Sequence, residues 1–87
     1  MQADKTQVTR LLKTVRGQID GILKMVEQDR YCIDISRQIM ASQAILKKVN
    51  KEILVAHMTH CVQTATQHQQ ADDKIDEMVT IIDELLK

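Results

Sequence analysis

The feature that most constrains the fold is a long stretch, from Cys32 to about Gln67, that contains no Gly and no Pro. A helix of this length extends for roughly 50 Å at ~1.5 Å per residue. A monomer of 87 residues offers no partner that long, so the stretch predicts the spine of a helical oligomer. Its apolar residues recur at helical spacing: Ile35, Ile39, Leu46, Val49, Ile53, Leu54, Met58, Cys61, Val62 and Ala65.

A medium-length amphipathic helix is expected before this stretch, from about Asp4 to Gln28. It contains the only two glycines, Gly17 and Gly21, which permit close approach of a neighbouring helix. A polar break with turn character follows at residues 27–31. The apolar face of this helix comprises Val8, Leu11, Leu12, Val15, Ile19, Ile22, Leu23 and Val26.

A short last helix is expected after a polar turn at residues 67–71, with Asp72 or Asp73 as its cap. The composition is 44% hydrophobic, mostly aliphatic, with one aromatic residue and no Pro. The chain is therefore predicted to be all-α, with three helices (medium, long and short) in a single domain, residues 1–87. The apolar face of the last helix comprises Ile75, Met78, Val79, Ile82 and Leu85 or Leu86.

Charge is distributed unevenly, although the net charge is zero. Residues 1–51 carry ten Lys and Arg against five Asp and Glu, whereas residues 52–87 carry two against seven. A basic first half favours an anionic partner, although an ordinary solvated surface explains the charge equally well. The absence of Phe and Trp argues against binding single-stranded nucleic acid by base stacking.

Other protein classes are excluded by what the sequence lacks. No apolar stretch is long enough to cross a membrane and no leader opens the chain, so a cytoplasmic protein is expected. In that compartment the two cysteines are expected to be thiols, metal ligands or redox sensors and not a disulfide. No activated nucleophile and no phosphate-cradling loop is present, so we do not expect an enzyme.

His57 and Cys61 form the first candidate site, because a spacing of four residues puts both on one face of a helix, one turn apart. The pair alone is weak evidence, since such a Cys is more often a small buried hydrophobe. Cys32 strengthens it. At ~100° per residue, the 25 residues from Cys32 to His57 make nearly seven full turns, so Cys32 projects from almost the same face.

Cys32 cannot meet His57 within one helix, because the two are about 37 Å apart along the axis. If two copies of the helix pack antiparallel, Cys32 of one copy lies beside His57 and Cys61 of the other. The two-fold axis of such a dimer then generates two identical sites. The spacing therefore predicts a soft-metal or thiol-sensing site that needs two chains.

Two thiolates and one imidazole are soft and borderline donors. They suit Cu(I), which accepts three ligands, better than Mg or Ca. Zinc competes for Cys and His but normally takes a fourth ligand. His60 is near in sequence, yet it points ~100° away from Cys61, and we expect His60 and His68 to be solvated.

These residues resemble the copper-sensing operon repressors (the CsoR family), which are all-helical bacterial transcriptional regulators. Residues 10–22, RLLKTVRGQIDGI, look like the family's first-helix signature, and residues 30–39, RYCIDISRQI, look like the start of its long second helix. His57 and Cys61 fall where the family places its remaining ligands. The Cys–His–Cys combination resembles the ligand set of the family's copper branch. The nickel and cobalt sensors of the family add histidines, and its formaldehyde sensors lack the second Cys.

The resemblance implies a function: a metal-free dimer of dimers binds operator DNA, and Cu(I) releases it so that copper efflux genes are derepressed. It also implies that Tyr31 and Glu77 form a hydrogen-bond network with the ligand histidine. From the residues alone, Tyr31 packs a corner between helices and Glu77 is solvated. The positions that look like the family's DNA-contacting residues are Arg10, Lys13, Arg16 and Lys48.

Two other functions stay open. The same family contains persulfide sensors that link two cysteines across chains, and Cys32 and Cys61 have that spacing. His57, Tyr31 and Glu77 favour copper, because a thiol sensor does not need them. The other hypothesis is a copper chaperone or storage protein without DNA binding, which gives the basic first half no role.

Overall fold

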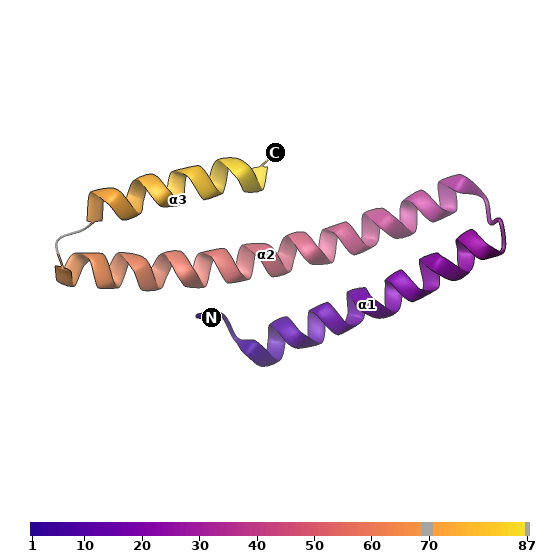
Figure 1. Cartoon of the computed structure of the whole chain (residues 1–87), viewed down its shortest axis with the longest axis horizontal. Helices are drawn as coiled ribbons and strands as arrows, with labels where there is room; N and C mark the ends of the chain where they lie inside the picture. The colour runs from indigo at the N-terminus through magenta and orange to yellow at the C-terminus, as the bar shows by residue number, and fades with distance from the viewer. Residues whose placement is uncertain (69–70, 87) are drawn as a thin grey trace. The chain divides into compact units, whose positions relative to one another are not determined.

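Three helices make up the part of the chain that the structure describes (Figure 1). The computed structural model describes residues 1–68 and 71–86, and their side chains except those of 65–68, 71, 72, 74 and 86. The helices contain 23, 37 and 16 residues, and the described ranges contain no strand. The predicted all-α fold with a medium, a long and a short helix is therefore confirmed. The helices are α1, Lys5–Glu27; α2, Cys32–His68; and α3, Ala71–Leu86.

Asp4 caps the start of α1. Its Oδ1 accepts hydrogen bonds from the backbone N–H groups of Thr6 (3.0 Å) and Gln7 (3.3 Å). A helix start leaves four N–H groups without an intrahelical partner, and Asp4 satisfies two of them. The helix therefore begins one residue after the predicted boundary.

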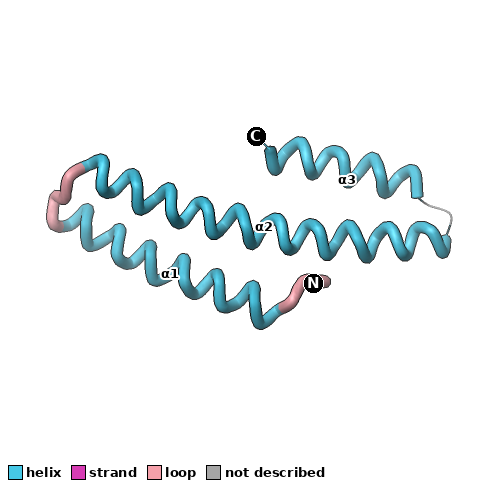
Figure 2. Tube along the Cα trace, turned by 180° about the vertical axis from the view of Figure 1, so that it is seen from behind, coloured by secondary structure: helices cyan, strands magenta, loops and turns pink. Residues whose placement is uncertain are grey.

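The turn between α1 and α2 is a short loop that closes α1 with a left-handed residue (pink in Figure 2). Asp29 has a φ of 51°. Its N–H donates to the carbonyl of Val26 (3.1 Å), and the N–H of Arg30 donates to that of Met25 (3.0 Å). This is the Schellman arrangement, in which residues beyond the helix satisfy its last carbonyls. The predicted polar break is confirmed at residues 28–31, whereas Glu27, which the prediction also included, still belongs to α1.

The junction between α2 and α3 differs from the prediction. Helix α2 continues through His68, and α3 already begins at Ala71. Asp72 and Asp73 therefore occupy helical positions and not the cap position, so that part of the prediction is wrong. Ala is the strongest intrinsic helix former, which explains why the helix extends to residue 71. Residues 69–70, in the middle of the expected turn, lie outside the described residues.

The chain divides into two compact units, of which one is Asp4–Val49. In this unit α1 lies beside the first half of α2 (Figures 1 and 2). Its one buried polar side chain among the described residues is Ser42, whose hydroxyl donates to Oε1 of Gln18 at 2.7 Å. That bond satisfies a group which would otherwise be costly to bury. The buried apolar side chains of the unit are Val8, Leu11, Val15 and Val49.

The second half of the apolar face of α1 is not covered within the chain. Ile19, Leu23 and Val26 are 47%, 56% and 54% exposed. Among the described residues nothing approaches the two glycines, because a Cβ added at Gly17 or Gly21 would meet nothing within 4 Å. The close approach of a neighbouring helix stays a prediction for a second copy of the chain. This stretch of α1 therefore exposes apolar surface that the unit Asp4–Val49 does not cover.

The other unit consists of Asn50–Lys87 together with Met1–Ala3. Here the second half of α2 lies beside α3. The described side chains of this unit are all exposed or half-buried, so one copy of it lacks a fully buried core.

Helix α2 presents apolar side chains in several directions and not along one narrow stripe. Such a helix is normally surrounded by other protein. No helix in the described residues is both long and apolar enough to cross a membrane. The large apolar side chains that α2 leaves exposed are Ile33, Ile39, Met40, Leu46, Val55 and Val62.

Candidate metal centre

His57 and Cys61 lie one turn apart on α2 with their side chains in contact. Sγ of Cys61 is 3.3 Å from Nε2 of His57. The contact follows from helix geometry, since residues four apart share a face. The His57 side chain is exposed, Cys61 is half-buried, and Cys32 and Cys61 are both free thiols. The helix therefore brings together two of the three predicted ligands.

Glu77 reaches this pair from α3. Its Oε1 is 3.7 Å from Nε2 of His57, and the two side chains are 44% and 47% exposed. At this separation the contact is electrostatic, because a hydrogen bond between nitrogen and oxygen is shorter. Glu77 thus lies beside His57. From the residues alone, Glu77 was expected to be a solvated carboxylate without this neighbour.

One nitrogen of the His57 ring makes both contacts, since Cys61 and Glu77 both approach Nε2. When Nε2 carries the proton, the ring can offer it to either partner, and Nδ1 keeps a lone pair for a metal ion. In many metal sites a carboxylate on one imidazole nitrogen decides which nitrogen is free to bind. In the tautomer with the proton on Nε2, Nδ1 is thus the ligand atom of the ring.

The third predicted ligand does not join the pair within one chain. Cys32 is the first residue of α2 and belongs to the unit Asp4–Val49, whereas His57 and Cys61 belong to the other unit. Among the described residues, no three His, Cys, Asp or Glu side chains converge closely enough to hold a metal ion. Tyr31 belongs to the same unit as Cys32 and is 65% exposed. One chain therefore contributes an incomplete set of ligands.

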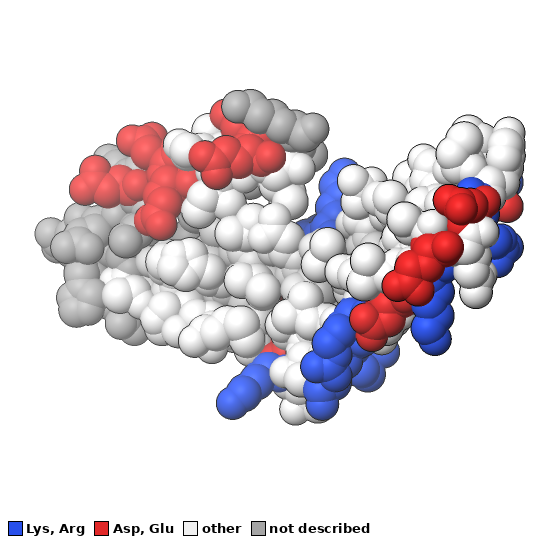
Figure 3. Space-filling view, turned by 45° about the vertical axis from the view of Figure 1, so that its right-hand side comes forward, with Lys and Arg blue, Asp and Glu red and all other residues white. Residues whose placement is uncertain are grey.

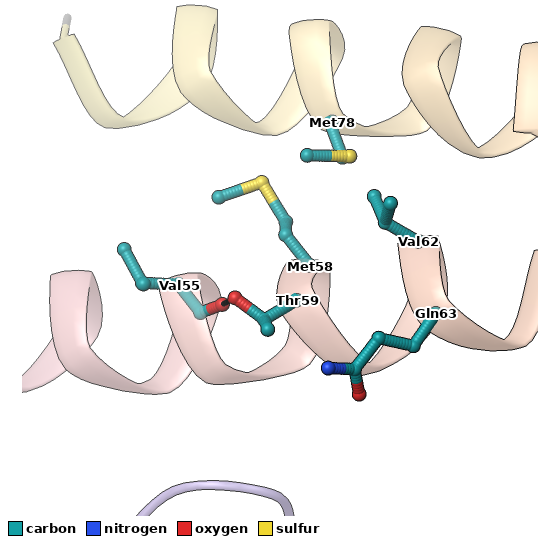
Figure 4. Close-up of a pocket in the computed structure, with 6 residues that line it drawn as sticks. All are labelled: Val55, Met58, Thr59, Val62, Gln63 and Met78. Carbon is teal, nitrogen blue, oxygen red and sulfur yellow. Dashed lines mark hydrogen bonds between the residues drawn. The ribbon is translucent and has the colours of Figure 1, made fainter.

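An apolar hollow of about 340 Å³ lies between α2 and α3 next to this pair (Figure 4). Met58 and Met78 directly follow His57 and Glu77 in the sequence. Figure 4 shows that both methionine side chains occupy the space between the two helices. Their packing therefore influences the distance between His57 and Glu77, a role that helical spacing alone did not reveal. The full lining is Val55, Met58, Thr59, Val62, Gln63 and Met78.

The four basic residues predicted to contact DNA belong to the unit Asp4–Val49, and all four are exposed. Arg10 is held by its neighbour Gln7, whose Oε1 accepts a hydrogen bond from Nη2 of Arg10 at 2.9 Å. Figure 3 shows acidic side chains gathered on α3, whereas the unit that contains α1 carries Lys and Arg side chains beside a line of acidic ones. The four residues are Arg10, Lys13 and Arg16 on α1 and Lys48 on α2.

Comparison with known proteins identifies the family. A family model described as "Metal-sensitive transcriptional repressor" matches residues 4–84. The chain belongs to this family. One relative is the copper-sensing transcriptional repressor CsoR of Bacillus subtilis, which is 40% identical over 84 residues, or 97% of this chain and 83% of that protein.

Solved structures of metal-sensing regulators share the fold. The copper-sensing repressor CsoR with Cu(I) from Geobacillus thermodenitrificans has a TM-score of 0.83 and 36% identity, covering 100% of this chain and 94% of that one. The nickel-responsive transcriptional regulator InrS has a TM-score of 0.82 and 25% identity, covering 98% and 96%. These two regulators respond to different metals, so the metal must be argued from the ligands and not from the fold.

Membership of the metal-sensitive repressor family makes this chain a transcriptional regulator and not an enzyme. It also implies DNA binding, which a copper chaperone or storage protein would not need. Family membership therefore favours a DNA-binding repressor over a copper chaperone or storage protein.

Shortening Met78 to Ala should loosen α3. Because the side chain is half-buried, its loss should lower the free energy of unfolding by about 1 kcal/mol and speed amide hydrogen exchange in α3. Thermal unfolding and hydrogen exchange at one fixed protein concentration measure both effects. Glu84→Ala, an exposed position on α3, is the control. Equal exchange in the two variants would contradict the role given to Met78.

Proposed function

We propose that this protein is a Cu(I)-responsive transcriptional repressor. The metal-free form binds double-stranded operator DNA, and binding of Cu(I) releases the DNA and derepresses copper efflux genes. The observation that carries this proposal is the contact of 3.3 Å between His57 and Cys61 in a member of the metal-sensitive repressor family. Two relatives named as copper-sensing repressors, with 40% and 36% identity, support copper as the signal.

The proposed ligands are Cys32, His57 and Cys61, with Cys32 supplied by a second copy of the chain. The donor set fits Cu(I), because both cysteines are free thiols and His57 has Nδ1 available. Both thiols must lose their protons, and His57 must be neutral, before they can act as ligands. Bound Cu(I) supplies soft bonds to sulfur and nitrogen that join two chains.

An antiparallel dimer, which pairs into a dimer of dimers, is the proposed assembly. Two observations support it: α2 leaves large apolar side chains exposed, and the unit with residues 50–87 has no fully buried side chain among those described. Association covers such surface and supplies the core that a small chain lacks. A site that needs Cys32 from a second copy requires the same association.

Arg10, Lys13, Arg16 and Lys48 are the proposed DNA contacts. All are exposed and belong to one compact unit. Contacts from such cations to phosphates supply most of the affinity and make it depend strongly on salt. Between Lys5 and Asp20, α1 carries no acidic residue, so this part of the helix is basic.

Glu77 is the proposed link between the ligands and α3. Its carboxylate lies 3.7 Å from Nε2 of His57, so any rotation of the ring that turns Nδ1 toward the thiolates also changes the contact with α3. Tyr31, adjacent to Cys32, is proposed to join this network from the second copy. A coupling of roughly 1–3 kcal/mol per site, repeated over symmetric sites, is enough to shift DNA binding if the DNA-free conformation binds Cu(I) better.

We further propose that residues 1–87 act as a single domain in the cytoplasm. The two compact units share α2, so neither contains only whole elements of its own. The family model also runs through both units. A repressor acts where the operator DNA is, which places it with the chromosome.

Persulfide sensing is the second candidate function, because Cys32 and Cys61 are both free thiols. In that case an external persulfide or polysulfide transfers a sulfur atom to one cysteine and releases its own thiol or shortened polysulfide. The thiolate of the other chain then attacks the cysteine sulfur of this Cys–S–SH group and expels HS⁻, which leaves a disulfide across chains. Such a sensor needs neither His57 nor Glu77. The contacts of His57 with Cys61 and Glu77 are the reason why we prefer copper.

Cu(I) should release the protein from DNA. In a gel-shift assay with DNA from upstream of its own gene, the metal-free protein should bind. One Cu(I) per chain should weaken binding by more than the roughly 5- to 150-fold typical of a single coupled site, because several symmetric sites contribute. The assay is done without oxygen and with excess reductant. Binding that Cu(I) does not change would overturn the copper-repressor proposal.

Substitution of His57 by Ala separates copper sensing from persulfide sensing. The variant should still bind DNA but should no longer respond to Cu(I), because only the two thiols remain. His60→Ala, an exposed histidine on the next turn, is the matched control and should respond normally. If His57→Ala still releases DNA with Cu(I), or if wild type responds only to persulfide, His57 is not a ligand.

Replacing Glu77 by Gln should weaken Cu(I) binding by about 10- to 100-fold, the usual effect of removing a partner behind a ligand histidine. DNA binding by the metal-free form should stay the same. Competition with a Cu(I) chelator measures the affinity, and Glu84→Gln serves as the control on α3. The proposed role of Glu77 fails if both variants hold copper as tightly as wild type.

A further inference from the structure

An open hollow lies along the first turns of α1, and only basic and hydroxyl side chains line it. It encloses about 510 Å³, and all of its lining residues are exposed. All of them also belong to α1 and to one compact unit. The lining consists of Lys5, Thr6, Thr9, Arg10 and Lys13. Two of these residues are already proposed as DNA contacts, and the other three have no role so far.

This wall lies on the side of α1 that faces away from its buried side chains. At ~100° per residue, the lining from Lys5 to Arg10 spans an arc of about 140°, and Arg16 falls within that arc. No acidic residue lies on this face before Asp20. Beyond that point Asp20 and Glu27 flank Lys24, so the charge becomes mixed. The purely basic part of the face is therefore its first three turns.

The end of α1 itself is not available to an anion. The carboxylate of Asp4 already accepts hydrogen bonds from the N–H groups of Thr6 and Gln7. A second anion there would meet that negative charge. A phosphate must therefore be bound by side chains along the helix and not by the backbone at its start.

The hydroxyl groups in the hollow are available as donors. Thr14, further along α1, donates its hydroxyl to the carbonyl of Arg10 at 3.1 Å. The hydroxyls of Thr6 and Thr9 make no such bond within the described part of the chain. A hydroxyl beside Lys and Arg is a common partner for a phosphate oxygen.

We propose that Lys5 and Thr9 contact the phosphate backbone of DNA, Lys5 by its charge and Thr9 by a hydrogen bond from its hydroxyl. This inference rests on the proposed function as a DNA-binding repressor. Duplex DNA fits better than a single small anion, because the cations from Lys5 to Lys13 extend over about 12 Å of helix. One strand of DNA carries a charge every ~3.4 Å along its axis. The contact surface then begins at the first residue of α1.

The charge contact is tested with Lys5→Gln in the full-length, metal-free protein. Fluorescence anisotropy with a labelled duplex from upstream of the gene gives the affinity over a salt series. Loss of one phosphate contact should reduce the slope of log affinity against log salt by about 0.9. The fall in affinity between 50 and 200 mM salt should thus be about 3.5-fold smaller than for wild type. Lys24→Gln, on the same face between Asp20 and Glu27, should leave the slope unchanged.

The hydroxyl contact is tested in the same assay with Thr9→Val. Binding should weaken by about tenfold or more at every salt concentration, the effect of one net hydrogen bond to a charged group, with an unchanged slope. Thr14→Val is the matched control and should bind like wild type. Circular dichroism of all four variants checks that the helices are intact.

The outcomes distinguish this inference from the proposed function. If wild type binds the duplex but Lys5→Gln keeps the full slope and Thr9→Val the full affinity, only the inference is wrong. If wild type shows no salt-dependent binding to the duplex, both are wrong. Equal loss in each variant and its control would also overturn the inference, because the effect would then not belong to the hollow.

Discussion

Because α2 is 37 residues long and is shared by both compact units, most properties of this protein depend on it. It carries Cys32 at its first residue, and His57 and Cys61 near its other end. A helix cannot fold back on itself, so these ligands stay apart within a chain. The same helix presents apolar side chains in several directions, which neither α1 nor α3 fully covers.

Two observations on the single chain therefore point to a second copy: its exposed apolar surface and its proposed ligand set. One chain exposes large Ile, Leu and Val side chains, and among its described residues the proposed ligands Cys32, His57 and Cys61 do not come together. In the proposed dimer, a second copy would cover the apolar side chains and would also supply Cys32 to the site. In the proposed assembly, folding, association and metal binding are coupled, because each stabilises the conformation that the others require.

Much of this fold could be predicted from sequence because its signals are local. The absence of Gly and Pro between Cys32 and Gln67 indicated α2, and Asp4 marked the start of α1. The spacing of His57 and Cys61 predicted their contact, since helical geometry alone determines it. The start of α3 was misplaced because Asp72 and Asp73 look like caps, whereas the helix begins at Ala71.

Features that depend on contacts between helices could not be predicted from the residues. The neighbour of His57 on α3, Glu77, was indicated only by the family resemblance. Met58 and Met78 appeared as ordinary members of apolar faces, and their meeting between α2 and α3 needs the tertiary structure. Helical periodicity describes one helix at a time, which is why these positions were missed.

Tyr31, in the turn after α1, gives this protein a spectroscopic probe of its own. Tyr31 is the only aromatic residue of the chain, lies directly before Cys32 and is 65% exposed. No Trp emission hides its fluorescence, and no second Tyr contributes to its absorbance. The protein thus carries a native optical reporter beside the one proposed ligand that must come from a different chain. Changes in the surroundings of that ligand can be followed by the fluorescence or absorbance of Tyr31, without an attached dye.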